Sequence, residues 1–277
     1  MAGKSIARRA VLAAAIAAGP AMVLAKRAFA EELKGDELPL VTTGLEHIGM
    51  VVPDVEAATR FYSSVFNPDL QKEKDGPPRY YVMLGSGYIA IGSRSGVTDS
   101  KIDHYCTLVR GYNRELMTRT LAEKGLPSAT RGVVPDPDDI GLQLIATPGG
   151  PGPTAVPGGR LVEVEPLVHP IGMDNIVLKV ADLARSADFY GHFFPKAKAP
   201  AKDQLAFKAA DTLIILRATA AGEVPGVASY SVRVAKFDHA KVTSGLIKLG
   251  ATPESKTRAG IVHFRDPNGL AVELKAV

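Results

Sequence analysis

The sequence predicts an α+β protein with two tandem copies of one domain, each a curved, cup-like sheet made of two βαβββ modules. The prediction starts from residues 44–66, where a strand with alternating faces runs directly into a helix with an apolar stripe. The same strand–helix unit returns at residues 173–194, at an offset of 128 residues. The Asp-Pro turn at Asp136 returns at Asp266, 130 residues later. Small drifts in offset with the turn residues kept are typical of loop insertions between duplicated domains.

The first 30 residues are predicted to be an export signal that does not belong to the fold. They begin with a basic segment containing Arg8-Arg9, continue with an alanine-rich apolar run at residues 10–25, and end in an Ala-Phe-Ala motif at residues 28–30. This order is that of a secretory signal peptide, and the arginine pair resembles the twin-arginine type. The apolar run falls short of the ~20 residues that a membrane anchor needs. We therefore expect cleavage after residue 30 and an exported, periplasmic protein.

The charge balance of the remaining chain argues against nucleic acid or an anionic membrane as a partner. Five of the 33 basic residues and none of the 29 acidic residues lie in residues 1–30, which leaves 28 basic and 29 acidic residues. The sequence pI near 9.0 therefore reflects the signal segment. The only cysteine, Cys106, excludes an internal disulfide and a lipidated cysteine at the signal boundary. A small molecule is the expected partner, and a homodimer is left open.

The first domain is expected at residues 43–147, after a short tether at residues 31–42. Asp54 and Asn113 are placed to cap two helices, and Gly125 is placed to end the second. A Gly-Ser-Gly turn joins the two strands of a hairpin. In order, the expected elements are a strand at 44–52, a helix at 55–66, a hairpin at 79–94, a strand at 101–110, a helix at 113–125 and a closing strand within 132–146.

A linker and a second domain are expected to follow. Nine of the twelve positions at residues 148–159 are Pro or Gly, so we assign residues 148–167 to an extended linker. Residues 168–277 repeat the plan of the first domain. The expected elements are a strand at 173–182, a helix at 183–194, a hairpin at 205–217, a strand–helix unit at 228–250 and a closing strand within 261–274.

The residues of both strand–helix units resemble a known family. The segment HIGMVVPDVEAATRFYSSVF, its counterpart DNIVLKVADLARSADFYGHFF and the closing DPNGLAVEL are similar to the vicinal oxygen chelate superfamily. That superfamily includes glyoxalase I, extradiol ring-cleaving dioxygenases and the bleomycin- and fosfomycin-resistance proteins. The resemblance covers essentially the whole mature chain and implies paired modules that curl into a cup around one divalent metal. It also implies ligands, typically His, His and Glu, on the first strand of each module and on a last strand.

Carried over position by position, the resemblance assigns the metal ligands to His47, His104 and Gln143 of the first domain. Two neutral imidazoles and an oxygen donor suit Fe(II), Mn(II), Ni(II) or Zn(II) and leave coordination positions for a substrate with neighbouring oxygens. Gln143 is a departure, because a neutral amide oxygen cancels no charge, although the glyoxalase branch resembles this chain in tolerating Gln. Asp138 and Asp139 in the preceding turn are alternatives that match no ligand position.

The second domain is expected to have lost its site. Its closing strand keeps Glu273, but Asn175 and Ser229 stand where the first domain has its histidines. This arrangement differs from that of the extradiol dioxygenases, in which the C-terminal pair of modules usually holds the metal.

Other side chains near the expected site have structural alternatives. Tyr81 and Tyr105 are candidates to donate hydrogen bonds beside the metal, as is Tyr88, and a place in the core or at the rim is the alternative. Cys106 is expected to be a small buried apolar residue, and His263 a surface or structural one. No further residue is assigned a catalytic role.

Two functions from different classes are consistent with these residues. The first is an exported metal-dependent enzyme that acts on a small substrate with vicinal oxygens, either like an extradiol dioxygenase or like a glyoxalase-type lyase or isomerase. The second is a metal-free protein of the bleomycin-resistance type that binds and sequesters a small molecule. The four-module length favours the dioxygenase branch, whereas Gln143 favours the glyoxalase branch or simple binding.

Overall fold

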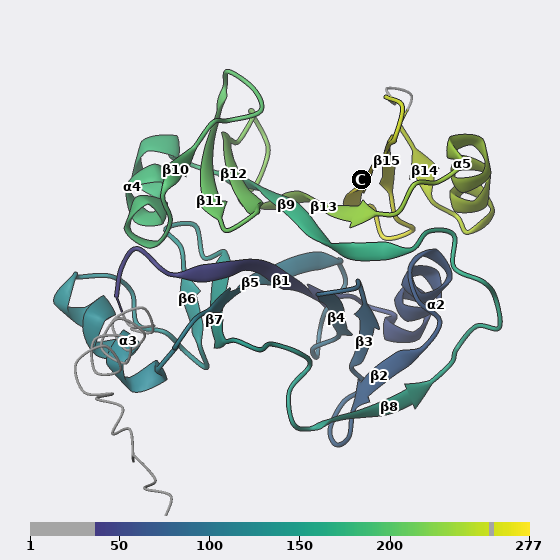
Figure 1. Cartoon of the computed structure of the whole chain (residues 1–277), viewed down its shortest axis with the longest axis horizontal. Coiled ribbons are helices and arrows are strands. Elements are labelled where there is room, and N and C mark those ends of the chain that lie inside the picture. Colours follow the sequence, from purple (N-terminus) through teal and green to yellow (C-terminus); the bar gives the residue numbers. More distant parts are fainter. Residues whose placement is uncertain (1–36, 255–257) are drawn as a thin grey trace, which may run out of the picture. The chain divides into compact units, whose positions relative to one another are not determined.

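The computed structural model describes residues 37–254 and 258–277 of the chain (Figure 1). The predicted signal peptide at residues 1–30 lies outside this part, as do residues 31–36 of the predicted tether. No helix within the described ranges is long and apolar enough to cross a membrane.

The first half of the described chain forms an eight-stranded mixed sheet with the order β6-β7-β5-β1-β4-β3-β2-β8. At its centre, β1 (Thr42–Val51) pairs antiparallel with β5 (Lys101–Val109). Each of these strands also pairs in parallel with the last strand of its module, β1 with β4 (Tyr88–Gly92) and β5 with β7 (Gly141–Ala146). The remaining elements are α2 (Val55–Val65), β2 (Leu70–Glu73), β3 (Tyr80–Met83), α3 (Arg114–Glu123), β6 (Val133–Pro135) and β8 (Ala155–Gly159).

Local sequence explains where the two helices begin. The Asp54 carboxylate accepts a hydrogen bond from the backbone N–H of Ala57 at 2.9 Å, which satisfies a donor at the start of α2. Asn113 does the same for Leu116 at the start of α3, at 3.0 Å. The apolar stripe of α2 is buried and packs against β3 and β4, so this helix covers one face of its own module.

The second half of the chain forms another eight-stranded sheet, with the order β10-β11-β12-β9-β13-β16-β15-β14. Its central strands β9 (Pro170–Val180) and β13 (Gly226–Val234) pair antiparallel, and each pairs in parallel with β12 (Thr212–Ala218) or β16 (Ala271–Ala276). The predicted α+β fold class with two related sheets is therefore confirmed. The other elements are α4 (Leu183–Phe193), β10 (Lys196–Ala197), β11 (Gln204–Ala209), α5 (His239–Lys248), β14 (Thr252–Pro253) and β15 (Ile261–Arg265).

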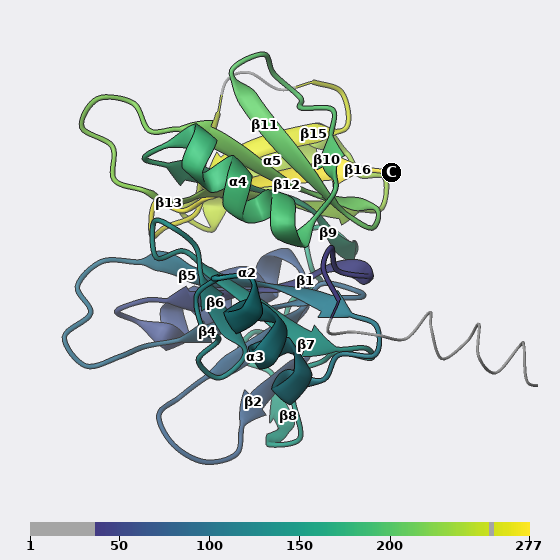
Figure 2. The ribbon, with the colours of Figure 1, turned by 90° about the vertical axis from the view of Figure 1, so that its left-hand side faces the viewer.

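The helices of the second sheet follow the same plan as those of the first. α4 packs against β11 and β12 (Figure 2), and α5 packs against β14 and β15 (Figure 1). The helices α2, α4 and α5 thus each cover strands of their own module.

Part of the predicted linker belongs to the first sheet. Residues 155–159 form β8, which pairs antiparallel with β2 and becomes an edge strand. Pro157 is tolerated in an edge strand, because such a strand needs hydrogen-bonding groups on one side only. The composition of residues 148–159 predicted an extended segment but did not indicate that β2 would pair with it.

Candidate metal centre

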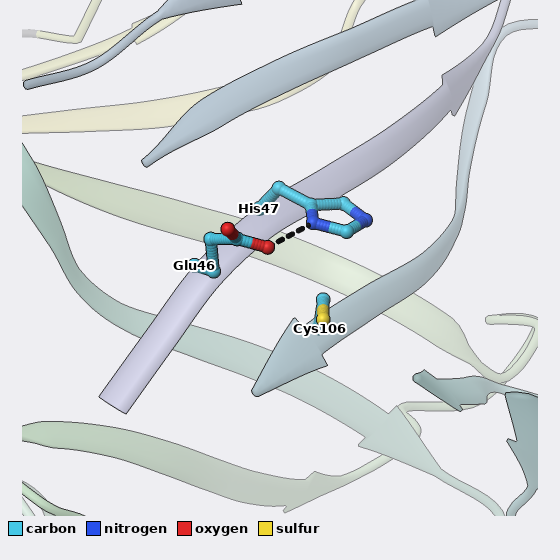
Figure 3. A group of neighbouring side chains, drawn as sticks. All are labelled: Glu46, His47 and Cys106. Atoms are coloured by element: carbon cyan, nitrogen blue, oxygen red, sulfur yellow. Dashed lines mark hydrogen bonds and ion pairs between the residues drawn. The ribbon is translucent and has the colours of Figure 1, made fainter. Parts of the chain in front are cut away.

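A β-bulge at Glu46 brings two neighbouring side chains of β1 to one side of the sheet. In the pairing of β1 with β5, Leu45 faces Thr107 and His47 faces Cys106, so Glu46 is an extra residue with no partner. Figure 3 shows the Glu46 carboxylate turned toward the imidazole, with Oε2 2.9 Å from Nδ1 of His47. Both side chains are buried, with 2% of Glu46 and 4% of His47 exposed. Simple alternation along the strand, which the sequence suggested, would have placed them on opposite faces.

The Glu46 carboxylate selects one tautomer of His47. Burial lowers the pKa of the imidazole, against the opposing effect of Glu46, so the ring is neutral. A carboxylate accepts a hydrogen bond and cannot donate one, so Nδ1 carries the proton and Nε2 presents its lone pair. That Nε2 atom lies 2.9 Å from Oε1 of Gln143 on β7.

His104 on β5 has the same kind of support. Its Nδ1 lies 3.0 Å from Oδ1 of Asp103, the residue before it. Its ring lies over Gly49 of β1, where any Cβ atom would overlap the imidazole. The His104 and His47 ring centroids are 5.4 Å apart and the rings are nearly perpendicular, at 88°. Within the described chain, Nε2 of His104 has no hydrogen-bond partner.

An acidic residue therefore precedes each of the two histidines and binds its Nδ1 atom. A carboxylate that accepts the N–H of a histidine is the usual partner of a metal-binding imidazole, because it orients the ring and raises its basicity. The dipeptides Glu46-His47 and Asp103-His104 are visible in the sequence. Strand alternation assigns adjacent residues to opposite faces, so the sequence did not predict this role for Glu46 or Asp103.

A second group of donors overlaps with the predicted one. Glu46, His47 and Cys106 have potential ligand atoms that all lie within 4.8 Å of one another (Figure 3). Cys106 is completely buried, and burial raises the pKa of its thiol well above the usual value, so the sulfur stays protonated. This agrees with the predicted role of a small buried residue. The Glu46 oxygens are already engaged, by Nδ1 of His47 and by the backbone N–H of Gly150.

The donor chemistry of the predicted set fits a divalent metal better. Nε2 of His47 and Oε1 of Gln143 are both acceptors in this tautomer, yet they lie only 2.9 Å apart. Two ligands of one ion at ~2.1 Å and roughly at right angles lie ~3 Å from each other. A cation between these atoms would satisfy both lone pairs, and His104 would supply a third donor on the same side.

The three predicted ligands line one large cavity of about 1130 Å³ on the face of the sheet away from the helices. Tyr88 stacks on His47, with ring centroids 4.4 Å apart, and also lines the cavity. Tyr81 lines it too and donates a hydrogen bond to Glu73 at 2.6 Å. Burial, with Glu73, raises the pKa of Tyr81 to about 12, so this hydroxyl keeps its proton at neutral pH.

Tyr105, a candidate to donate a hydrogen bond beside the metal, takes the core position that was its alternative. Its side chain is almost completely buried in the hydrophobic core of the sheet. Adjacent residues of β5 point to opposite faces, so Tyr105 faces the helices where His104 and Cys106 face the cavity side. Asp139 does line the cavity, whereas Asp138 binds Arg185 and the backbone N–H of Ala181 in the second half of the chain.

The Pro/Gly segment at residues 148–153, called the strap below, forms one wall of this cavity. The strap is held at Gly150, whose N–H donates to Glu46 and whose carbonyl accepts from Tyr88 Oη at 3.2 Å. A side chain at Gly149 would overlap Oε1 of Glu46. The same buried carboxylate thus orients His47 and holds the strap.

Part of the chain matches the model of a known protein family. Residues 44–155 match the model of the Glyoxalase/Bleomycin resistance protein/Dioxygenase superfamily. This segment contains all three predicted ligands and the whole strap. A comparison of the whole chain with curated proteins finds no match.

Solved structures share the fold over most of the chain. The Mn(II)-bound glyoxalase from Novosphingobium aromaticivorans is 15% identical, with a TM-score of 0.59 over 85% of this chain and 82% of that one. Homoprotocatechuate 2,3-dioxygenase from Arthrobacter globiformis is 13% identical, with a TM-score of 0.62 over 87% and 81%. An extradiol ring-cleaving dioxygenase from B. fuscum is 12% identical, with a TM-score of 0.64 over 87% and 73%. At these identities the similarity establishes the fold.

The second sheet has different contacts at the positions that correspond to Glu46 and Gln143 of the first sheet. Asp174 takes the place of Glu46, and Nζ of Lys275 lies 2.9 Å from its Oδ2. Glu273, at the position of Gln143, accepts a hydrogen bond from Ser231 at 2.6 Å and lies 3.4 Å from Nε2 of His263. Glu273 is thus already engaged by neighbouring side chains. In the second sheet, the partner of the corresponding carboxylate, Asp174, is thus the ammonium group of Lys275 and not a histidine.

Proposed function

We propose that the protein is a metal-dependent enzyme that acts on a small substrate with two neighbouring oxygens, as an extradiol-type dioxygenase or a glyoxalase-type lyase or isomerase. His47, His104 and Gln143 would hold one divalent ion. The observation that carries the proposal is the pair of acceptor atoms, His47 Nε2 and Gln143 Oε1, which lie 2.9 Å apart on two residues that line a large cavity. When bound, such an ion acts as a Lewis acid on the substrate oxygens.

The residues of the chain have separate tasks in this proposal. Glu46 and Asp103 hold the protons on Nδ1 of the two histidines and leave each Nε2 free to bind. The Tyr88 ring packs against the His47 ring and keeps it from rotating. The strap covers one side of the cavity and separates the site from bulk water there.

Metal binding by matched variants tests the proposal. Wild-type protein incubated with Fe(II), Mn(II), Ni(II) or Zn(II) is expected to retain about one ion per chain, measured by elemental analysis after desalting. His104→Ala should lose the ion, because two remaining donors rarely hold a labile divalent metal. Ser229→Ala, the corresponding position of the second domain, should keep it. Retention of no metal by the wild type would contradict the proposal.

Gln143 offers a test from the other side. Gln143→Glu places a charged oxygen where the amide oxygen now lies 2.9 Å from His47 Nε2. If this oxygen is a ligand, the added charge should tighten metal binding. If metal binding is unchanged, the ion is held elsewhere, and the group of Glu46, His47 and Cys106 becomes the alternative.

The alternative function is metal-free binding of a small molecule, as in the bleomycin-resistance type. The neutral Gln143 favours it, and so do the apolar and aromatic groups of the cavity wall, among them Tyr81, Tyr88 and Ile145. The two functions differ in one measurement. A binding protein keeps its ligand affinity after treatment with a chelator, whereas the proposed enzyme loses it.

We also propose that residues 1–30 direct export by the twin-arginine route, which carries folded proteins. The support is the basic start with Arg8-Arg9 and the Ala-Phe-Ala motif at residues 28–30. Replacing both arginines with lysine should leave the precursor in the cytoplasm in a fractionation experiment. Mass spectrometry that finds residues 1–30 on the native exported protein would contradict the cleavage.

A further inference from the structure

The wall of the cavity carries an excess of positive charge. Among the residues that the structure describes, four arginines line it, together with two carboxylates, those of Asp103 and Asp139. Asp103 is engaged twice, by Arg94 and by Nδ1 of His104. The buried His47 is neutral and adds no charge. The four arginines are Arg79, Arg94, Arg114 and Arg131.

Arg131 is held over the cavity by a tight hairpin turn. The backbone N–H of Thr130 donates to the carbonyl of Val133 at 2.9 Å, and the N–H of Val133 returns the bond to Thr130 at 2.9 Å. Only Arg131 and Gly132 stand between them, and both have positive φ angles, of 53° and 82°. This is the geometry of a two-residue type I′ hairpin, which strongly prefers Asn-Gly.

The left-handed backbone conformation at this position is therefore unfavourable for arginine. A residue with a long side chain in the left-handed region is less favourable than Asn or Gly, because its Cβ crowds the following carbonyl. Non-glycine residues in this region gather at functional sites. Arg131 is exposed, lines the cavity and has no ion pair with any carboxylate of the described chain.

A second guanidinium lies beside the hairpin. Nη2 of Arg114 is 3.9 Å from the point that a Cβ of Gly132 would occupy. Arg114 is the first residue of α3, so the positive end of the helix adds to the same field. Two arginines and a helix start thus face the rim of the cavity near β6, whereas Arg94 on the other side is neutralised by Asp103.

We propose that the substrate is an anion, with a carboxylate in addition to its two neighbouring oxygens, and that Arg131 is the residue that recognises this carboxylate, with Arg114 beside it. Guanidinium groups bind carboxylates through paired, charge-assisted hydrogen bonds. For the neighbouring oxygens, the inference rests on the proposed function. The carboxylate is recognised by the arginines and not by the metal.

The test compares two ligands that differ by one carboxylate. Catechol and 3,4-dihydroxybenzoate are titrated into Mn(II)-loaded protein by calorimetry. We expect the carboxylate-bearing ligand to bind about tenfold more tightly, which is the effect of one charged hydrogen-bonded contact. Higher salt should reduce the preference, because the arginines are exposed.

Arg131→Asn is the decisive variant, because Asn suits the turn better than Arg. Its melting temperature should be equal to or higher than that of the wild type, while the preference for the carboxylate falls about tenfold and catechol binding is unchanged. Arg131→Lys should keep part of the preference. Arg119→Gln is the control, because Arg119 lies on the exposed face of α3 and outside the cavity. It should leave the affinity for both ligands unchanged.

The outcomes separate this inference from the proposed function. If metal and catechol bind but the carboxylate adds nothing, or if Arg131→Asn keeps the full preference, the inference is wrong and the proposed function stands. If no metal binds, the proposed function fails, and the same pair of ligands is titrated into the metal-free protein. A preference there that Arg131→Asn removes supports carboxylate recognition, and its absence overturns it.

Discussion

The hydroxyl of Tyr62 donates a hydrogen bond to Oδ2 of Asp266 at 2.7 Å, across the boundary between the two halves of the chain. The repeat-related pair forms the same bond in the opposite direction, from Tyr190 to Oδ2 of Asp136, at 2.9 Å. All four side chains are buried. Each half thus supplies one tyrosine from its first helix and one aspartate from its closing turn.

The two aspartates form the turns that the sequence predicted, and they also accept the hydrogen bonds of the two tyrosines. Oδ1 of Asp136 accepts from the backbone N–H groups of Asp138 and Ile140, both at 2.8 Å. Oδ1 of Asp266 does the same for Asn268 and Leu270. The second oxygen of each carboxylate is left for the tyrosine of the other half.

Removing either tyrosine hydroxyl should destabilise the protein. Tyr62→Phe leaves a buried carboxylate oxygen without its donor, which costs about 1–3 kcal/mol. Tyr190→Phe should cost a similar amount, because its bond to Asp136 is the same. Denaturant unfolding measures both. Tyr80→Phe, a half-buried tyrosine on β3, is the control, and losses no larger than its own would show that the two bonds contribute nothing.

The same carboxylates predict a pH dependence of stability. Burial raises the pKa of Asp266 above its ordinary value of 3.8, although hydrogen bonds from Tyr62, Leu270 and Asn268 oppose the rise. A raised pKa in the folded state means that the native protein binds the proton more tightly than the unfolded chain. This contribution is fully present below pH ~3.8 and is lost as the pH rises through the folded-state pKa.

Asp266→Asn isolates this contribution. The difference in unfolding free energy between the wild type and this variant should shift in favour of the wild type as the pH falls from 7 to about 3.5. Asp136→Asn should behave in the same way, because burial raises the pKa of Asp136 too. A difference that is flat with pH, or that shifts toward the variant in acid, would contradict the assignment.

Glu46→Gln should weaken metal binding without removing any ligand. An amide nitrogen in place of Oε2 would donate to Nδ1 of His47, which moves the ring proton to Nε2 and removes the lone pair that faces Gln143. Loss of such a partner typically reduces metal affinity 10–100-fold. Metal titration measures the affinity, and nitrogen NMR of the imidazole reports the tautomer. Asp174→Asn, the corresponding change in the second sheet, should leave the affinity unchanged.

Gly149→Ala should disturb both the strap and the metal centre. The added methyl group would overlap Oε1 of Glu46, so either the strap or the carboxylate must move. We expect metal affinity to fall by about tenfold and limited proteolysis within residues 148–153 to become faster. Gly191→Ala is a suitable control, because a Cβ there meets only Phe207, at 4.0 Å. Unchanged metal affinity in Gly149→Ala would show that the strap does not help to position Glu46.

The sequence by itself determined the elements and their repetition. Strand alternation and the helical period are local properties, and the caps at Asp54 and Asn113 need only their own turn, so these features were predicted correctly. The repeat then placed His47 and His104 on the central strands β1 and β5. Their meeting at one cavity follows from the antiparallel pairing of these strands.

The tertiary structure decided everything that depends on register or on the other half of the chain. The bulge at Glu46 exists only in the pairing of β1 with β5, and it reverses the face that alternation predicts. The strap reaches the site because β8 pairs with β2, and Arg131 reaches the cavity because a hairpin holds it there. The bond from Tyr62 to Asp266 joins residues 204 positions apart. No local pattern encodes such contacts, because each needs a surface that two distant segments form only when they pack together.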